Sequence, residues 1–162
     1  MKRSQHIIEL VESYCRLIES IERIGERELE QLSHLLGKLH AEIGVLGKPR
    51  PEQAQLSAID LDARFELFSH LHALLGDYDR YWMEFDAHGH EQMSGSLADD
   101  LTDIYCELKP GLTLLDEEPR RALDSWRHGF HLHWGEHMVD AIRHLHRLRL
   151  QLPATETAAS RA

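Results

Sequence analysis

The sequence predicts an all-α fold, an antiparallel bundle of about five helices. Apolar residues recur at spacings of three and four along most of the chain, which is the period of amphipathic helices. They nowhere alternate for more than a few positions, so no strand is expected. The breaks between these stretches are short, as they are between antiparallel neighbours in a bundle. A chain of 162 residues is expected to form one domain, here over residues 1–152.

The first two expected helices cover residues 5–24 and 27–45 and form a hairpin. Gly25 interrupts the apolar period between them and marks the turn. Their apolar faces consist of Ile7, Val11, Tyr14, Ile18 and Ile21 in the first helix, and Leu29, Leu32, Leu36, Leu39, Ile43 and Leu46 in the second. Two prolines within residues 47–51 then break the helix, because proline lacks a backbone donor and disfavours helix in the preceding residue.

A third helix is expected over residues 61–75, with Gly76 as its kink or end. Aromatic residues at helical spacing indicate that the helix resumes over residues 78–85. Residues 86–95 contain two glycines between polar residues and are expected to form a loop. This loop would lead directly into the fourth helix.

The fourth helix is expected to begin at Ser96, because Asp99 follows three residues later as in a capping box. Residues 109–111, which include a proline, should bend or end it. The last helix is expected from Pro119 to Leu152. Proline is favoured at the first position of a helix, where a backbone N–H would have no partner within the helix. Residues 153–162 have no apolar period and should be a mobile tail.

Composition excludes several classes of function. The 28 acidic against 18 basic residues give a net charge of −10, which disfavours nucleic-acid binding. The basic residues cluster after Pro119, so we expect a basic last helix to pack against an acidic remainder. The chain contains no run of 18 apolar residues, so no segment is expected to span a membrane. Cys15 and Cys106 are too few for a cysteine-based zinc site, and we expect buried, reduced thiols in a cytoplasmic protein.

Histidine is the unusual residue, with 13 in the chain and six of them in the expected last helix. On a helical wheel, four polar side chains border the apolar face within roughly 60° of one another: His133, His137, Asp140 and His144. Imidazoles four residues apart can share one Zn²⁺ or Fe²⁺, and a carboxylate one turn away can complete the site. The alternative is that His133 and His137 are half-buried and hydrogen-bonded to neighbouring helices.

Residues 133–137 also match the His-x-x-Glu-His string of one class of zinc peptidases. That string has three fixed positions and arises easily in a histidine-rich helix. The peptidases that carry it are much larger α/β proteins, so this match does not determine our prediction.

Three acidic residues of the fourth helix share a face beside its apolar stripe: Asp100, Asp103 and Glu107. The helix dipole favours carboxylates in the first turn of a helix, but Asp103 and Glu107 lie beyond that turn. Asp103 and Glu107 could pair with the basic last helix, bind a divalent ion or face water. The candidate metal ligands of this helix are Asp100 and Asp103. Glu107 is also a candidate member of an interaction or polar network, together with three further residues: Tyr105, Arg143 and Trp134.

This acidic helix is similar to the second acidic helix of MazG-like nucleotide pyrophosphohydrolases. In those all-α enzymes, Glu and Asp of two helices hold Mg²⁺, so the resemblance implies a metal-dependent hydrolase. It covers about ten residues. The enzymes carry a Glu-x-x-Glu pair shortly upstream, whereas the pair available here, Glu9 and Glu12, lies about 90 residues away.

Three segments carry a more extensive resemblance: Tyr81-Trp82-x-x-Phe85, Asp100-Leu-Thr-Asp103-Ile-Tyr105-Cys-Glu-Leu-Lys109-x-Gly-Leu112, and Trp126-x-x-x-Phe130-x-x-His133-Trp134-Gly135-x-His137-x-x-Asp140-Ala141-x-Arg143-x-Leu145-His146. Together they resemble an uncharacterised bacterial helical family, the domain of unknown function 5063. The resemblance covers most of the chain. It implies a small all-helical cytoplasmic protein and supplies no activity, substrate or catalytic residue.

These observations predict a small binding or accessory protein without catalytic activity, which binds a protein partner or a small molecule. The alternative is a divalent-metal-binding bundle in which two facing helices supply carboxylates and imidazoles. One distance separates these classes. If a carboxylate of the fourth helix and an imidazole of the last helix converge within reach of one ion, the metal site is favoured.

Overall fold

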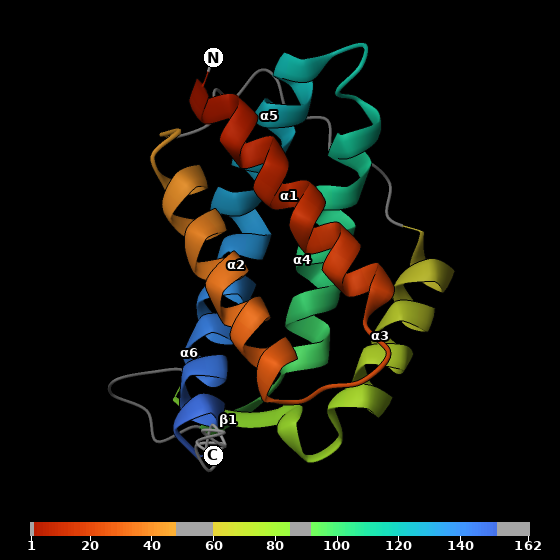
Figure 1. Cartoon of the computed structure of the whole chain (residues 1–162), viewed down its shortest axis with the longest axis vertical. Coiled ribbons are helices and arrows are strands. Elements are labelled where there is room, and N and C mark those ends of the chain that lie inside the picture. The colour runs from red at the N-terminus through yellow and green to blue at the C-terminus, as the bar shows by residue number, and fades with distance from the viewer. Residues whose placement is uncertain (1, 48–59, 85–91, 152–162) are drawn as a thin grey trace, which may run out of the picture.

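The computed structural model describes residues 2–47, 60–84 and 92–151 (Figure 1). Its elements are α1 (Lys2–Ser20), α2 (Glu26–Gly44), α3 (Leu61–Leu75), a 3-10 turn (Gly76–Tyr78), β1 (Arg80–Glu84), β2 (Gln92–Ser96), α4 (Leu97–Thr113), α5 (Pro119–Gly129), the π-helical turn η2 (Phe130–Trp134) and α6 (Gly135–Gln151). Because α5, η2 and α6 follow without a break, they form one long last helix. The predicted bundle of about five packed helices is confirmed, with a small hairpin added.

Helix α4 lies at the centre of the bundle. It packs against α1, α3, α5 and α6, while α2 packs against α1 and α6. Successive helices run in opposite directions, and α2 and α3 lie on opposite sides of the molecule (Figure 1). One face of α4 is therefore covered by α3 and another by the last helix, and side chains between these faces can meet residues of both.

The hairpin of α1 and α2 is as predicted. The apolar residues assigned to the two faces are buried from Ile7 to Ile43, and only Leu46 is partly exposed. Gly25 caps α2, and its backbone N–H donates to the Glu28 carboxylate at 3.0 Å. Tyr14 joins this hairpin to α4, because its hydroxyl donates to the Leu101 carbonyl at 2.8 Å.

Helix α3 packs on the bundle with its C-terminal half. Asp60 caps its start by accepting hydrogen bonds from two backbone N–H groups, each at 3.1 Å. Leu71 and Leu75 are buried, whereas Leu61 and Phe65, apolar residues in the first half of the helix, are 74% and 67% exposed. Gly76 ends the helix with φ +52°, a conformation that favours glycine.

Two predictions for the next segment were wrong. Helix does not resume after residue 78, and residues 80–84 and 92–96 form antiparallel strands instead of helix and loop. Tyr81 is buried and its neighbour Trp82 is exposed, which is the period of a strand. Gly95 lies opposite Tyr81, and a Cβ there would lie 2.2 Å from the tyrosine ring. The tyrosine therefore lies flat across the glycine backbone.

Helix α4 begins where predicted and ends later. The Ser96 hydroxyl accepts a hydrogen bond from the Asp99 N–H at 3.2 Å. The helix then passes through Pro110 to Thr113, so of the two predicted effects of residues 109–111, a bend or an end, the end is excluded. Gly111 follows this proline, and the absence of a side chain there lets Trp126 pack directly on α4.

The last helix starts at Pro119 as predicted, but it is interrupted by the π turn η2. Gly135 fits this turn, since a Cβ there would lie 2.2 Å from the Phe130 carbonyl oxygen. Such turns insert one residue and often occur at functional sites. The predicted tail, residues 153–162, lies outside the described residues.

Both cysteines are free thiols. Cys15 is buried, which raises the pKa of its thiol to about 12, whereas Cys106 is only partly buried, contrary to the prediction. No helix among the described residues is long and apolar enough to cross a membrane.

Candidate functional site

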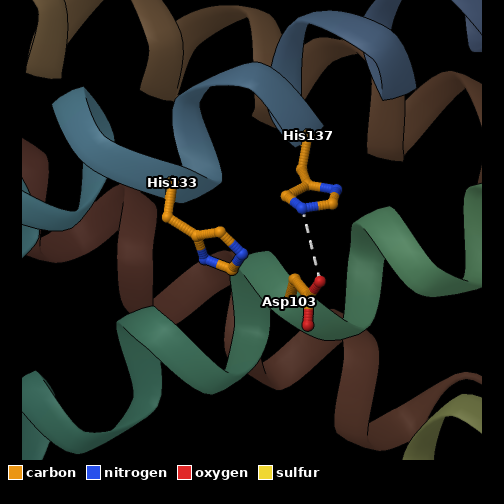
Figure 2. A group of neighbouring side chains, drawn as sticks. All are labelled: Asp103, His133 and His137. Atoms are coloured by element: carbon orange, nitrogen blue, oxygen red, sulfur yellow. Dashed lines mark ion pairs between the residues drawn. The ribbon is translucent and has the colours of Figure 1, made fainter.

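A group of polar side chains lies between α4 and the last helix. Asp100, Asp103 and Glu107 stand at positions i, i+3 and i+7 of α4, so they share one face of the helix. His133 and His137 stand four residues apart on the last helix and direct their rings toward Asp103 (Figure 2). The predicted convergence of a carboxylate of the fourth helix with imidazoles of the last helix is therefore present in the structure.

The three side chains in Figure 2 lie within reach of a single ion. One ligand atom each from Asp103, His133 and His137 lies within 4.8 Å of the others. Around a tetrahedral Zn²⁺ with bonds of about 2.0 Å, such atoms would be about 3.3 Å apart. Asp103 is buried, His137 is half-buried and His133 is exposed, so the group opens to solvent on the side of the two imidazoles.

Each imidazole is held on its outer nitrogen by a second carboxylate of α4. His137 Nδ1 lies 2.8 Å from Asp100 Oδ1, and His133 Nδ1 lies 3.2 Å from Glu107 Oε1. An ionised carboxylate only accepts hydrogen bonds, so Nδ1 is the donor in both pairs. The Nε2 atoms are left for the centre of the group, where His137 Nε2 lies 3.4 Å from Asp103 Oδ2. Metal-binding histidines are commonly oriented by a carboxylate in this way.

Asp100 is itself held from the hairpin. The Tyr81 hydroxyl donates to Asp100 Oδ2 at 2.5 Å, and His137 occupies the other oxygen. Burial raises the pKa of Asp100, against the lowering effect of both hydrogen bonds. The hydrogen bond to Asp100 raises the pKa of His137, and nearby Asp103 acts in the same direction.

Arg64 of α3 holds the central carboxylate on its other side. Its Nε donates to Asp103 Oδ1 at 2.7 Å, and its Nη2 donates to Asp99 Oδ1 at 2.8 Å. Asp103 Oδ2 remains for the two imidazoles. Arg64 and Tyr81 were not among the predicted site residues. The packing of α3 and of the hairpin against α4 cannot be deduced from the spacing of residues within either element.

Trp134 is fully buried beside the site, as expected for a network candidate in the apolar stripe. Its Nε1 has no hydrogen-bond partner among the described residues. A Cβ on Gly129 would lie 2.7 Å from this nitrogen and 2.9 Å from Glu107 Oε2. The indole N–H and the carboxylate that orients His133 thus border the same small space at the π turn.

Two predicted metal ligands lie away from this group, and a third, Asp100, contacts the outer nitrogen of His137 and is not part of the group. His144 Nε2 lies 2.7 Å from the Tyr78 carbonyl oxygen, and Asp140 accepts from Arg143 at 3.2 Å. Both residues share the stripe of His137, but a helix rises about 1.5 Å per residue, so His144 lies about 10 Å further along. A helical wheel shows the common direction of side chains and omits this distance.

Four other candidate residues also have separate contacts. Tyr105 donates to Glu19 of α1 at 2.7 Å, and Arg143 lies 5.9 Å from the centre of the Tyr81 ring. Glu9 and Glu12, the pair needed for a MazG-like site, contact residues of their own helix, namely Gln5, His6 and Arg16. Neither glutamate belongs to the group at Asp103.

The chemistry of the site suits a divalent cation. The central group offers two imidazole nitrogens and one carboxylate oxygen, a donor set found with Zn²⁺ and with Fe²⁺. Four carboxylates, those of Asp99, Asp100, Asp103 and Glu107, face the two imidazoles and Arg64. The excess of negative charge favours a bound cation.

Comparison with known proteins gives a family without an assigned function. A family model described as "Domain of unknown function (DUF5063)" matches residues 1–151. No curated protein shows significant similarity to the chain.

A solved structure has the same fold. It is protein BF1032 from Bacteroides fragilis, a structural genomics target. The TM-score is 0.73 at 19% sequence identity, and the match covers 91% of this chain and 92% of that one. At this identity the likeness is evidence for the fold and carries no function.

Proposed function

We propose that this chain, which belongs to the DUF5063 family, is a divalent-metal-binding protein. The family has no assigned function. Asp103, His133 and His137 would hold one Zn²⁺ or Fe²⁺ between α4 and the last helix. The observation that carries the proposal is the convergence of their three ligand atoms within 4.8 Å.

The surroundings of the three side chains support this proposal. Asp100 and Glu107 each occupy an Nδ1 atom, so both imidazoles would bind through Nε2 in a fixed orientation. Asp100 and Tyr81 are buried, and their short hydrogen bond anchors one side of the site. A site with rigid outer contacts loses less conformational freedom when it binds an ion.

Three protein ligands leave a position open, which is the arrangement of catalytic zinc and iron sites. A bound metal would supply Lewis acidity and lower the pKa of a coordinated water. Hydrolysis is therefore the activity to assay, with nucleoside triphosphates among the substrates because of the MazG-like acidic helix. The positions of Glu9 and Glu12 do not support a MazG-like nucleotide hydrolase, because both side chains contact residues of their own helix.

A second candidate is a metal-free binding or accessory module without catalysis. It is favoured by the ion pairs already formed at the site, in which Arg64 contacts Asp103 and His137 lies between two carboxylates. On this account the polar residues fix the packing of α3, α4 and the last helix. A protein or small-molecule partner would bind elsewhere.

Metal analysis and titration distinguish these two candidates. Protein purified without a histidine tag would be analysed for Zn and Fe and titrated calorimetrically with Zn²⁺, and under anaerobic conditions with Fe²⁺. The first candidate predicts one ion per chain. It also predicts that the double variant His133→Ala/His137→Ala loses this binding.

The matched control removes two histidines outside the site. His34 and His146 are exposed and lie on α2 and α6. The variant His34→Ala/His146→Ala should bind zinc as the unmodified chain does. An equal loss in both double variants would mean nonspecific binding by surface histidines and would contradict the proposal.

A further inference from the structure

A cleft of about 600 Å³ opens beside the site, on the Asp100 side of His137. Its walls come from α3, the β-hairpin, the start of α4 and α6, and they include Phe68, Trp82, Asp99 and Asp140. This volume lies within the range of small-molecule binding sites. His137 is the residue that the cleft shares with the proposed metal group, which otherwise consists of Asp103 and His133.

Trp82, whose side chain is exposed, is among the residues that line this cleft. Trp82 is 66% exposed, whereas Trp126 and Trp134 are fully buried. The other aromatic rings of the cleft already have neighbours, since Phe68 stacks on His72 and Tyr81 packs on His144. Among the described residues no ring or cation covers Trp82. Its face is available to a ligand, and indole is the side chain that attracts cations most strongly through its π system.

The charges of the cleft are mainly negative. Its carboxylates are Asp79, Asp99, Asp100 and Asp140, and Arg80 is the one arginine or lysine among its lining residues. Asp79 and Asp100 are buried, and both oxygens of each already accept hydrogen bonds or contact a histidine. Asp99 and Asp140 each have one oxygen engaged by an arginine, at Arg64 and Arg143, and one oxygen without a partner among the described residues.

These carboxylates do not form a second metal site. Among the described residues, the one group whose ligand atoms converge is that of Asp103, His133 and His137. The free oxygens of the cleft are instead distributed along its wall together with an aromatic face. That arrangement suits a larger cation with an apolar body, whose charge meets the carboxylates while its body contacts the ring.

We infer that this cleft binds a small organic cation, a primary ammonium group carried on an aromatic or alkyl body. The ammonium would contact Asp140 and Asp99, and the body would pack on Trp82 and Phe68. Anionic ligands are disfavoured by the carboxylates of the wall. Of the three proposed metal ligands, His137 alone lines this cleft. The inference therefore holds whether or not a metal is bound.

The test is a titration of the full chain with phenethylammonium chloride, followed by the three tryptophan indole N–H signals in ¹H–¹⁵N NMR spectra. We expect saturable shifts of the Trp82 signal at about millimolar concentration, as for a ligand of this size. The signals of Trp126 and Trp134 are internal references, because both rings are buried elsewhere. The same result is expected with and without EDTA, so failure here is separate from failure of the metal proposal.

Two isosteric ligands and two matched variants complete the experiment. Uncharged 2-phenylethanol and anionic phenylacetate should bind more weakly than the ammonium. Asp140→Asn should weaken binding roughly two- to fivefold, whereas Glu136→Gln, an exposed carboxylate of α6 outside the cleft, should not. Absence of saturable shifts at Trp82, equal binding of the alcohol, or equal effects of the two variants would overturn the inference.

Discussion

The imidazole of His137 lies against the buried carboxylate of Asp100, with 2.8 Å between Nδ1 and Oδ1. This contact raises the pKa of His137 and directs its second nitrogen toward Asp103. It therefore determines two properties of the site at once, the charge of the ring and the atom it presents. The predictions below follow from that pair and from its neighbours.

The metal-free protein should lose stability as the pH rises above about 6.5, the ordinary pKa of histidine. A histidine whose folded pKa is raised binds its proton more tightly in the folded chain, so its contribution is complete below the unfolded pKa. That contribution disappears as the pH passes through the folded pKa. Thermal melts in EDTA between about pH 5.5 and about pH 9, a range that begins below the ordinary histidine pKa and extends well above it, should show this decline.

The control for this pH effect is an exposed histidine of α6 outside the site. His137→Gln should flatten the decline, whereas His146→Ala, at an exposed position of α6, should leave it unchanged. A decline of the same size in the His137 variant would assign the effect to another group.

Asp100→Asn should weaken metal binding by roughly 10- to 100-fold, the usual effect of removing a carboxylate behind a histidine ligand. The amide has no charge to favour the Nδ1 proton, so the orientation of His137 is less well defined. Calorimetric titration with Zn²⁺ measures the change. Asp116→Asn, an exposed residue after α4, is the matched variant that should bind zinc normally.

Arg64→Met should change stability and metal affinity in opposite directions. The metal-free fold should be less stable, because Asp99 and Asp103 lose their partner. Zinc affinity should rise, because a positive charge next to the ion is removed. Melts and titrations of the same samples test both signs, and Arg16→Met on the surface of α1 is the control. A fall in both quantities would favour the metal-free network as the role of these residues.

Gly129→Ala should destabilise the protein by about 1–3 kcal/mol, the usual cost of overpacking. The new Cβ would lie 2.7 Å from Trp134 Nε1 and 2.9 Å from Glu107 Oε2, so the indole or the carboxylate must move. Gly37→Ala in α2 is the matched change, with no atom within 4 Å of the new Cβ. It should be neutral or stabilise by about 0.5–1 kcal/mol. Urea unfolding measures the free energy of unfolding of both variants. Similar values for the two would contradict this account.

The sequence predicts most of the helices because their apolar faces have the helical period and their starts carry polar caps. Ser96 and Pro119 define the starts of α4 and of the last helix correctly. The hairpin was missed because residues 78–85 also fit helical spacing. What excludes the helix is tertiary, since Tyr81 is buried across Gly95 and bonded to Asp100.

The site was predicted in part. His133, His137 and Asp103 could be chosen because each lies on the polar edge of an amphipathic helix. Their convergence depends on how α4 lies against the last helix and on the π turn, neither of which is encoded in the spacing within one helix. The same limit explains Arg64, which comes from a third helix. His144 was wrongly grouped because the wheel omits distance along the axis.

The most direct test of the metal site is an anomalous difference map from crystals of the full chain grown with ZnCl₂. The account predicts one strong zinc peak between Asp103 Oδ2 and the Nε2 atoms of His133 and His137, with Zn–N distances of about 2.0–2.1 Å. His137 Nδ1 should remain on Asp100. Zinc bound only at other histidines, or no peak between these three side chains at saturating zinc, would contradict the account.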